Sequence, residues 1–161
     1  MATVPNRFTR RQALQASVTP IGLSALSFAA PEGWNDSDLI SPKELADRLA
    51  AKNGRKPMVL CVGFNVLYRS KHVPGSLYTG PGNKPEGLDL LKSTVASQTK
   101  DREIILYCGC CPWVHCPNMK PSFDLLRQLG YKNVKAVMIE TNFATDWIQH
   151  GYPVEGNTTG A

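Results

Sequence analysis

Two short, continuously apolar runs, and a third that only Lys135 interrupts, constrain the fold of this chain more than any other feature. They occupy residues 58–62, 104–107 and 134–139. Runs of this length without alternating polar residues are typical of strands that are buried on both faces, as in a parallel sheet. Because helical patterns lie between the runs, the sequence predicts an α/β fold with a largely parallel sheet and helices on both of its faces.

Helix signals support this alternation of strands and helices. A serine followed by a proline and a glutamate forms a capping signal that predicts a helix over residues 42–52. Apolar residues at helical spacing predict further helices from residue 88, from residue 121 and over residues 142–150. A loop rich in proline and glycine is expected over residues 81–87.

The composition indicates one domain and gives no sign of nucleic-acid binding. A chain of 161 residues with 42% hydrophobic residues can build its own core. The formal charge is +5, but three of the 18 basic residues lie in the acid-free residues 1–29, which leaves 15 basic against 13 acidic residues. So small an excess is not the charge pattern of a protein that binds phosphates, and no nucleic-acid partner is expected.

Residues 1–29 resemble a signal peptide of the twin-arginine type. The pair Arg10-Arg11 precedes a mostly apolar, acid-free stretch that is too short and too interrupted to span a membrane comfortably. Small residues then precede an expected cleavage site after Ala29. The sequence thus predicts periplasmic or secreted localisation and no stable membrane insertion after cleavage; the alternative is a disordered basic tail.

A dense group of cysteines is the least random feature of the chain. Four of its five cysteines, Cys108, Cys110, Cys111 and Cys116, lie within nine positions between a predicted strand and a predicted helix. Backbone N–H groups of a tight loop and the start of the following helix favour a thiolate there, and nearby His115 and Lys120 add positive charge. We expect a nucleophilic cysteine in this loop.

This loop and two further segments resemble the rhodanese domain, a member of the sulfurtransferase superfamily. The segments are the strand that ends at Cys108, the turn over residues 72–76 and the chain ending over residues 147–154. The resemblance covers residues 38–155 and leaves 156–161 as a flexible tail. It implies a parallel sheet of about five strands and a cysteine, Cys108, that carries sulfur as a persulfide.

The chain also departs from the pattern of that family. The loop after Cys108 is longer than in rhodaneses that act on thiosulfate, and Lys120 is its only cation apart from His115. Such a loop would hold thiosulfate poorly. Cys61 and Gly63 stand where the family commonly has an Asp and an Arg. We expect substrate contacts from Trp113, His115 and Lys120, although an aromatic side chain in a long loop can also serve only as an anchor.

Three functions fit the cysteines. In the first, Cys108 is the catalytic nucleophile in sulfur transfer or thiol–disulfide exchange with a small sulfur donor or a thiol protein, and Cys110, Cys111 or Cys116 resolves the intermediate without a cofactor. In the second, these four cysteines, with His115 as a further candidate ligand, bind a soft metal such as zinc or copper. In the third, the cysteines form a structural disulfide and the domain is a catalytically silent binding module.

Overall fold

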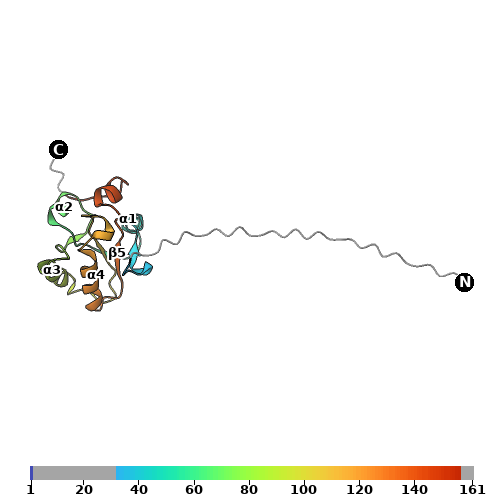
Figure 1. Ribbon diagram of the computed structural model, residues 1–161, viewed down its shortest axis with the longest axis horizontal. Coiled ribbons are helices and arrows are strands. Elements are labelled where there is room, and N and C mark those ends of the chain that lie inside the picture. Colours follow the sequence, from blue (N-terminus) through green and yellow to red (C-terminus); the bar gives the residue numbers. More distant parts are fainter. Residues whose placement is uncertain (2–31, 157–161) are drawn as a thin grey trace.

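The computed structural model describes Met1 and residues 32–156 of the chain (Figure 1). The expected signal peptide, residues 1–29, therefore lies outside the described residues except for Met1. The expected tail, 156–161, lies outside them except for Gly156. Among the described helices, none is long and apolar enough to cross a membrane.

The core of the molecule is a parallel sheet, as the sequence predicted. Its strands in chain order are β1 (Leu39–Ile40), β2 (Met58–Cys61), β3 (Leu77–Tyr78), β4 (Ile104–Tyr107) and β5 (Val134–Val137). In space they follow the order β1-β5-β4-β2-β3, and every neighbouring pair is parallel. Strand β4 thus lies at the centre, and its last residue pairs with the last residue of β2.

Helices cover both faces of the sheet, which also confirms the predicted fold class. The α-helices are α1 (Pro42–Ala50), α2 (Asn65–Ser70), α3 (Pro85–Val95) and α4 (Met119–Gln128). Three short elements add to them: two 3-10 turns, η1 (Asp36–Asp38) and η2 (Trp113–His115), and one π-helical turn, η3 (Ala144–Ile148). Figure 1 shows α3 and α4 side by side, with η3, in red, at the other end of the domain.

Two separate hydrophobic clusters explain why the central strands are apolar at every position. Leu60 and Leu106 pack with α3 and α4 on one face of the sheet. Their neighbours Val59 and Ile105 pack with α1 and Trp147 on the other. Because successive side chains of a strand point to opposite faces, a strand covered by helices on both sides needs an apolar residue at each position.

The structure corrects two predicted segments. The loop expected over residues 81–87 is shorter, because α3 already begins at Pro85, where a proline suits the first position of a helix. The helix expected over residues 142–150 is only the π-turn η3, preceded by a capped turn. There the carboxylate of Asp146 accepts hydrogen bonds from the N–H groups of Thr141 and Asn142.

Candidate active site

The first cysteine of the loop, Cys108, directly follows the central strand. It is only 6% exposed and lies at the carboxyl edge of the sheet, next to Gly63, which comes after β2. A Cβ atom at Gly63 would lie 3.1 Å from the Sγ atom of Cys108. The absence of a side chain at this position therefore leaves room for the sulfur.

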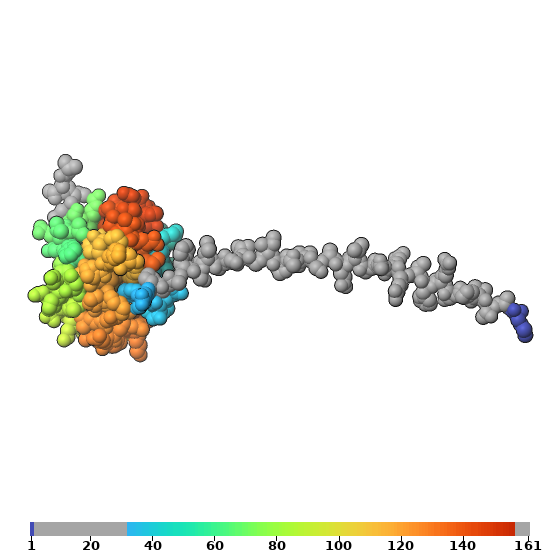
Figure 2. All heavy atoms as spheres, in the orientation of Figure 1, coloured from blue at the N-terminus to red at the C-terminus, as the bar shows by residue number. Residues whose placement is uncertain are grey.

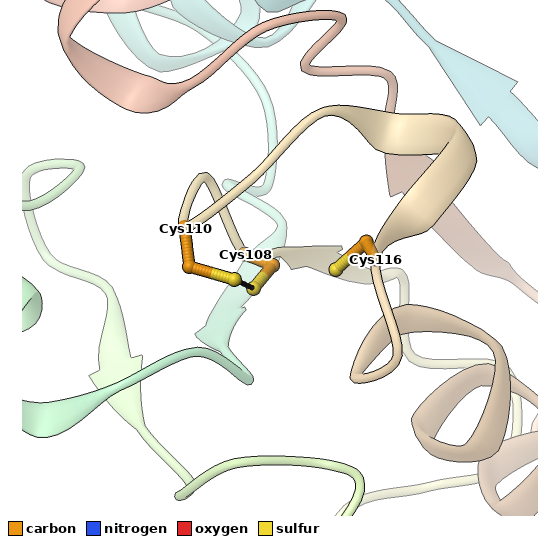
Figure 3. Close-up of side chains that lie close together, drawn as sticks. All are labelled: Cys108, Cys110 and Cys116. Carbon is orange, nitrogen blue, oxygen red and sulfur yellow. Dashed lines mark hydrogen bonds between the residues drawn. The ribbon is translucent and has the colours of Figure 1, made fainter.

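Three sulfur atoms of the loop come together at this edge. The Sγ atoms of Cys108, Cys110 and Cys116 all lie within 4.8 Å of one another, and we call these three residues the sulfur cluster. The side chains of Cys110 and Cys116 approach Cys108 from two sides (Figure 3). The Cys108 thiol donates a hydrogen bond of 3.1 Å to the Sγ of Cys110, whose other neighbour is the Sγ of Cys111 at 3.2 Å. All five cysteines are free thiols.

A glycine and an aromatic residue hold the loop in place. Gly109 adopts a φ of 74°, and a Cβ atom there would lie 2.7 Å from the Cβ of Phe143. The N–H of Phe143 also donates a 3.0 Å hydrogen bond to the Gly109 carbonyl. Only glycine combines this backbone conformation with so close an approach of a neighbouring segment.

A buried asparagine contacts the sulfurs. Asn118 is 0% exposed, and its Nδ2 lies 3.4 Å from the Sγ of Cys108 and 3.6 Å from that of Cys110. Its Oδ1 accepts a 3.2 Å hydrogen bond from the N–H of Asn83. The sequence analysis did not identify Asn118, although an asparagine just before a helix that follows the cysteines was a usable signal.

The hydrogen bonds of the cluster lower the pKa of two thiols. Cys110 accepts hydrogen bonds from Cys108 first of all, and also from Cys111, Cys116 and Asn118, and its pKa falls to about 6. The pKa of Cys116 falls to about 7 because its sulfur likewise accepts from Cys108 and from backbone N–H groups at the start of α4. Donors that converge on a sulfur stabilise the thiolate.

The other two thiols of the loop keep their protons. Hydrogen bonds to the sulfurs of Cys110 and Cys116, together with burial, raise the pKa of Cys108. Burial and the neighbouring Cys110 raise the pKa of Cys111 to about 12. The start of α4 was expected to favour a thiolate at the nucleophile, but its N–H groups reach Cys116 instead of Cys108. The hydrogen bonds of the cluster therefore favour a thiolate on Cys110 first and on Cys116 second, and they keep the proton on Cys108.

The three side chains predicted to contact substrate do not line the cavity that contains Cys108; Trp113 and Lys120 line a second pocket, beside Trp34. Trp113 is buried, with its ring 5.0 Å from that of Trp34. The ammonium group of Lys120 pairs with Asp124 at 2.5 Å. His115 is exposed on η2. Their substrate contacts remain predictions. The positive charge of Lys120, which the sequence analysis assigned to the loop, is paired with Asp124.

Cys61 lies on the opposite face of the sheet from the core that surrounds Cys108. It is 3% exposed, and burial raises its pKa to about 11. A thiol with these properties behaves as a small hydrophobic residue.

A cavity of about 380 Å³ opens onto the sulfur cluster. Cys61 at the end of β2 lines it together with three segments that are far apart in the sequence: α2 with Lys71, residues 107–110, and residues 142–148. Figure 2 shows these segments in green, yellow-orange and red, meeting on one face of the molecule. Because Cys108 and Cys110 are both part of the lining, a ligand in the cavity would meet the two hydrogen-bonded thiols.

Solved structures share this arrangement of strands and helices. A rhodanese-like domain from Anabaena sp. superposes with a TM-score of 0.57 at 22% identity, over 77% of this chain and 86% of that one. A Bacillus halodurans protein gives 0.58 at 24% identity, over 74% and 77% of the two chains. The fold is rhodanese-like.

A third structure with the rhodanese-like fold belongs to a named enzyme. Thiosulfate sulfurtransferase from Pseudomonas aeruginosa matches at 20% identity with a TM-score of 0.54, over 76% of this chain but only 21% of that one. No protein-family model and no curated protein matches the chain. At identities below 25%, these similarities establish only the fold. The chemistry has to be inferred from the residues of this chain.

Proposed function

We propose that this rhodanese-like domain transfers sulfur through a persulfide on Cys108, with Cys110 as the group that takes up the Cys108 proton. The observation that carries the proposal is the 3.1 Å hydrogen bond from Cys108 to Cys110 at the mouth of the cavity. A nucleophilic thiol needs a base within hydrogen-bond reach, and this pair provides both. The rhodanese-like fold and the position of Cys108 after the central strand support the same assignment.

The proposed step conserves atoms and charge. A donor X–S⁻ carries the sulfur to be transferred, where X is the leaving group. A bond forms between the Sγ of Cys108 and this sulfur, and the bond between the sulfur and X breaks. X leaves as an anion with the electron pair, and the Cys108 proton moves to the Cys110 thiolate. The products are Cys108–S–S⁻, X⁻ and a neutral Cys110 thiol.

Delivery of the sulfur reverses these movements. The thiolate of an acceptor, a small thiol or a thiol protein, attacks the outer sulfur of the persulfide. Cys110 returns its proton to Cys108 as that bond breaks. Cys116 and Cys111 are the candidates that resolve a mixed disulfide, because the Sγ of Cys116 lies within 4.8 Å of Cys108 and that of Cys111 lies 3.2 Å from Cys110.

We also propose that residues 1–29 direct export. Beyond the cytosol a thiol site meets oxidants, so it needs a reducing partner or a disulfide cycle to remain active. Separation of cells into fractions, followed by N-terminal sequencing, tests whether the chain starts after Ala29 in the exported fraction.

Intact-mass spectrometry tests the proposed function. The protein is incubated with a sulfane-sulfur donor, and we expect an adduct of about 32 Da, the mass of one sulfur, on the wild type. The adduct should be absent from Cys108→Ser and present on Cys61→Ser, because Cys61 lines the same cavity but burial raises its pKa to about 11 and keeps its thiol protonated. An adduct that persists in Cys108→Ser would contradict the assignment. Stable loss of hydrogens from disulfides alone would favour the silent binding module.

A specific observation supports a second candidate, a soft-metal site. The three Sγ atoms within 4.8 Å of one another form a donor set that suits Zn(II) or Cu(I), and Cys111 adds a fourth sulfur next to Cys110. When bound there, such an ion would stabilise the loop. Native mass spectrometry after addition of Zn(II) or Cu(I), with a Cys116→Ser variant, tests this candidate. Stoichiometric metal, lost in the variant and unaffected by sulfane donors, would favour it over sulfur transfer.

A further inference from the structure

The cavity beside the sulfur cluster has a distinct chemical character. Its lining is mostly apolar and includes Leu67, Tyr68, Phe143 and Ile148. Its volume of about 380 Å³ falls within the range of pockets that bind small organic ligands, about 300–1,000 Å³. A small inorganic anion would leave most of this apolar surface in contact with water.

One positive charge lies in the lining. Lys71 is the only cationic side chain of the lining, which also includes the Cys110 thiolate, and no carboxylate pairs with Lys71 among the residues that the structure describes. The surrounding sequence is also free of negative charge, since residues 48–85 contain no Asp or Glu. The cavity thus presents an apolar interior with one cation and no nearby acidic residue from this segment.

We propose that the cavity selects organic sulfane-sulfur donors that combine an apolar body, such as an aryl group, with one negative charge. The inference rests on the proposed sulfur transfer and names its substrate class. The apolar body lies between α2 and residues 142–148, the reacting sulfur faces Cys108, and Lys71 attracts the anion. An aryl thiosulfonate is a donor of this kind, because loss of its outer sulfur to Cys108 leaves an aryl sulfinate anion.

The experiment compares two thiosulfonates of equal charge. Benzenethiosulfonate and methanethiosulfonate are each mixed with the protein, and the rate of the one-sulfur adduct is divided by the rate with free cysteine, which removes their difference in intrinsic reactivity. We expect the normalised rate to be at least about tenfold higher for the aryl donor, the usual scale of discrimination in an apolar pocket. Equal normalised rates would overturn the inference and leave sulfur transfer intact.

A matched pair of variants localises the preference. Ala144 is exposed and lines the cavity, so Ala144→Trp should fill it without disturbing the core. We expect this variant to lose the aryl preference and to keep its rate with the methyl donor. Val114 is 73% exposed and outside the lining, and Val114→Trp should keep the preference. A preference that survives Ala144→Trp would contradict the cavity assignment.

Binding of the sulfinate product tests the cavity without requiring the sulfur-transfer reaction. Benzenesulfinate should bind the wild type in a calorimetric titration, and Lys71→Gln should weaken it about two- to fivefold, the scale of an exposed ion pair. Lys84 belongs to the same acid-free segment but lies outside the lining, so Lys84→Gln should have no effect. Sulfinate binding without any sulfur adduct would support the cavity assignment and overturn the proposed function. If neither sulfinate binding nor a sulfur adduct is observed, both the cavity assignment and the proposed function are overturned.

Discussion

The thiol of Cys108 donates a 3.1 Å hydrogen bond to the sulfur of Cys110, two residues further along the loop. This single contact separates two roles that the sequence could not distinguish. Cys110 holds the negative charge, and Cys108, at the end of the central strand, holds the proton that must leave before it can attack. The two thiols therefore act as a pair.

The first prediction concerns the pH dependence of Cys110. A thiolate reacts with iodoacetamide and a thiol does not, and the pKa of Cys110 is lowered from 9.0 to about 6. Its alkylation, followed peptide by peptide, should be half-maximal near pH 6 and should fall as the pH drops through that value. Cys108→Ala removes the main hydrogen-bond donor and should move the midpoint upward. A midpoint near pH 9 in the wild type would contradict the described network.

The second prediction concerns Asn118. Asn118→Ala removes its contacts with both sulfurs and with Asn83, so the alkylation midpoint of Cys110 should rise and the free energy of unfolding should fall by about 1–2 kcal/mol. Asn133→Ala is the control, because that exposed side chain donates only to the Asp101 carbonyl. An unchanged midpoint in Asn118→Ala would show that the amide does not stabilise the thiolate.

The third prediction concerns Gly109. Gly109→Ala places a Cβ against Phe143 in a left-handed conformation, and we expect the free energy of unfolding to fall by about 2–4 kcal/mol. Gly151 has nearly the same φ, 73°, with no atom within 4 Å of an added Cβ. Gly151→Ala should therefore cost only about 1 kcal/mol. Urea denaturation measures both, and equal losses would exclude a steric role for Phe143.

The fourth prediction concerns Trp113. Its buried ring packs against Trp34 and the core, so Trp113→Ala should lower the free energy of unfolding by about 3 kcal/mol. Val114→Ala, at an exposed neighbouring position, should change it by less than about 0.5 kcal/mol. With Trp113→Phe, an unchanged KM for the sulfur donor would indicate an anchor, whereas a raised KM would assign Trp113 a contact with substrate.

The fold could be predicted from local patterns where those patterns are long enough. Strands β2 and β4 could be recognised because burial on both faces requires an apolar residue at each position, and β5 is apolar except at Lys135. The two edge strands could not be found in the same way. Each is only two residues long, Leu39–Ile40 and Leu77–Tyr78, and so short a segment carries no periodicity. They form strands because each pairs with a neighbouring strand of the sheet, β1 with β5 and β3 with β2.

Part of the candidate site could also be predicted from local sequence. Four cysteines lie close together in the sequence, so their proximity in space required no knowledge of tertiary structure. The distribution of charge among them did require it, since it depends on Asn118 and on the direction of the Cys108 thiol. The cavity could not be predicted from the sequence either, because it is lined by Lys71, Cys110 and Phe143, which come from segments that only the fold brings together.

The most direct test of the central claim locates the transferred sulfur. The protein is treated with one equivalent of a sulfane-sulfur donor, the product is trapped with an alkylating reagent, and the modified cysteine is identified by peptide mass spectrometry. We expect the additional sulfur on Cys108 in the wild type, and slower formation with a higher pH midpoint in Cys110→Ser. Sulfur found on Cys116 or Cys110, or no persulfide at any cysteine, would contradict the proposed role of Cys108.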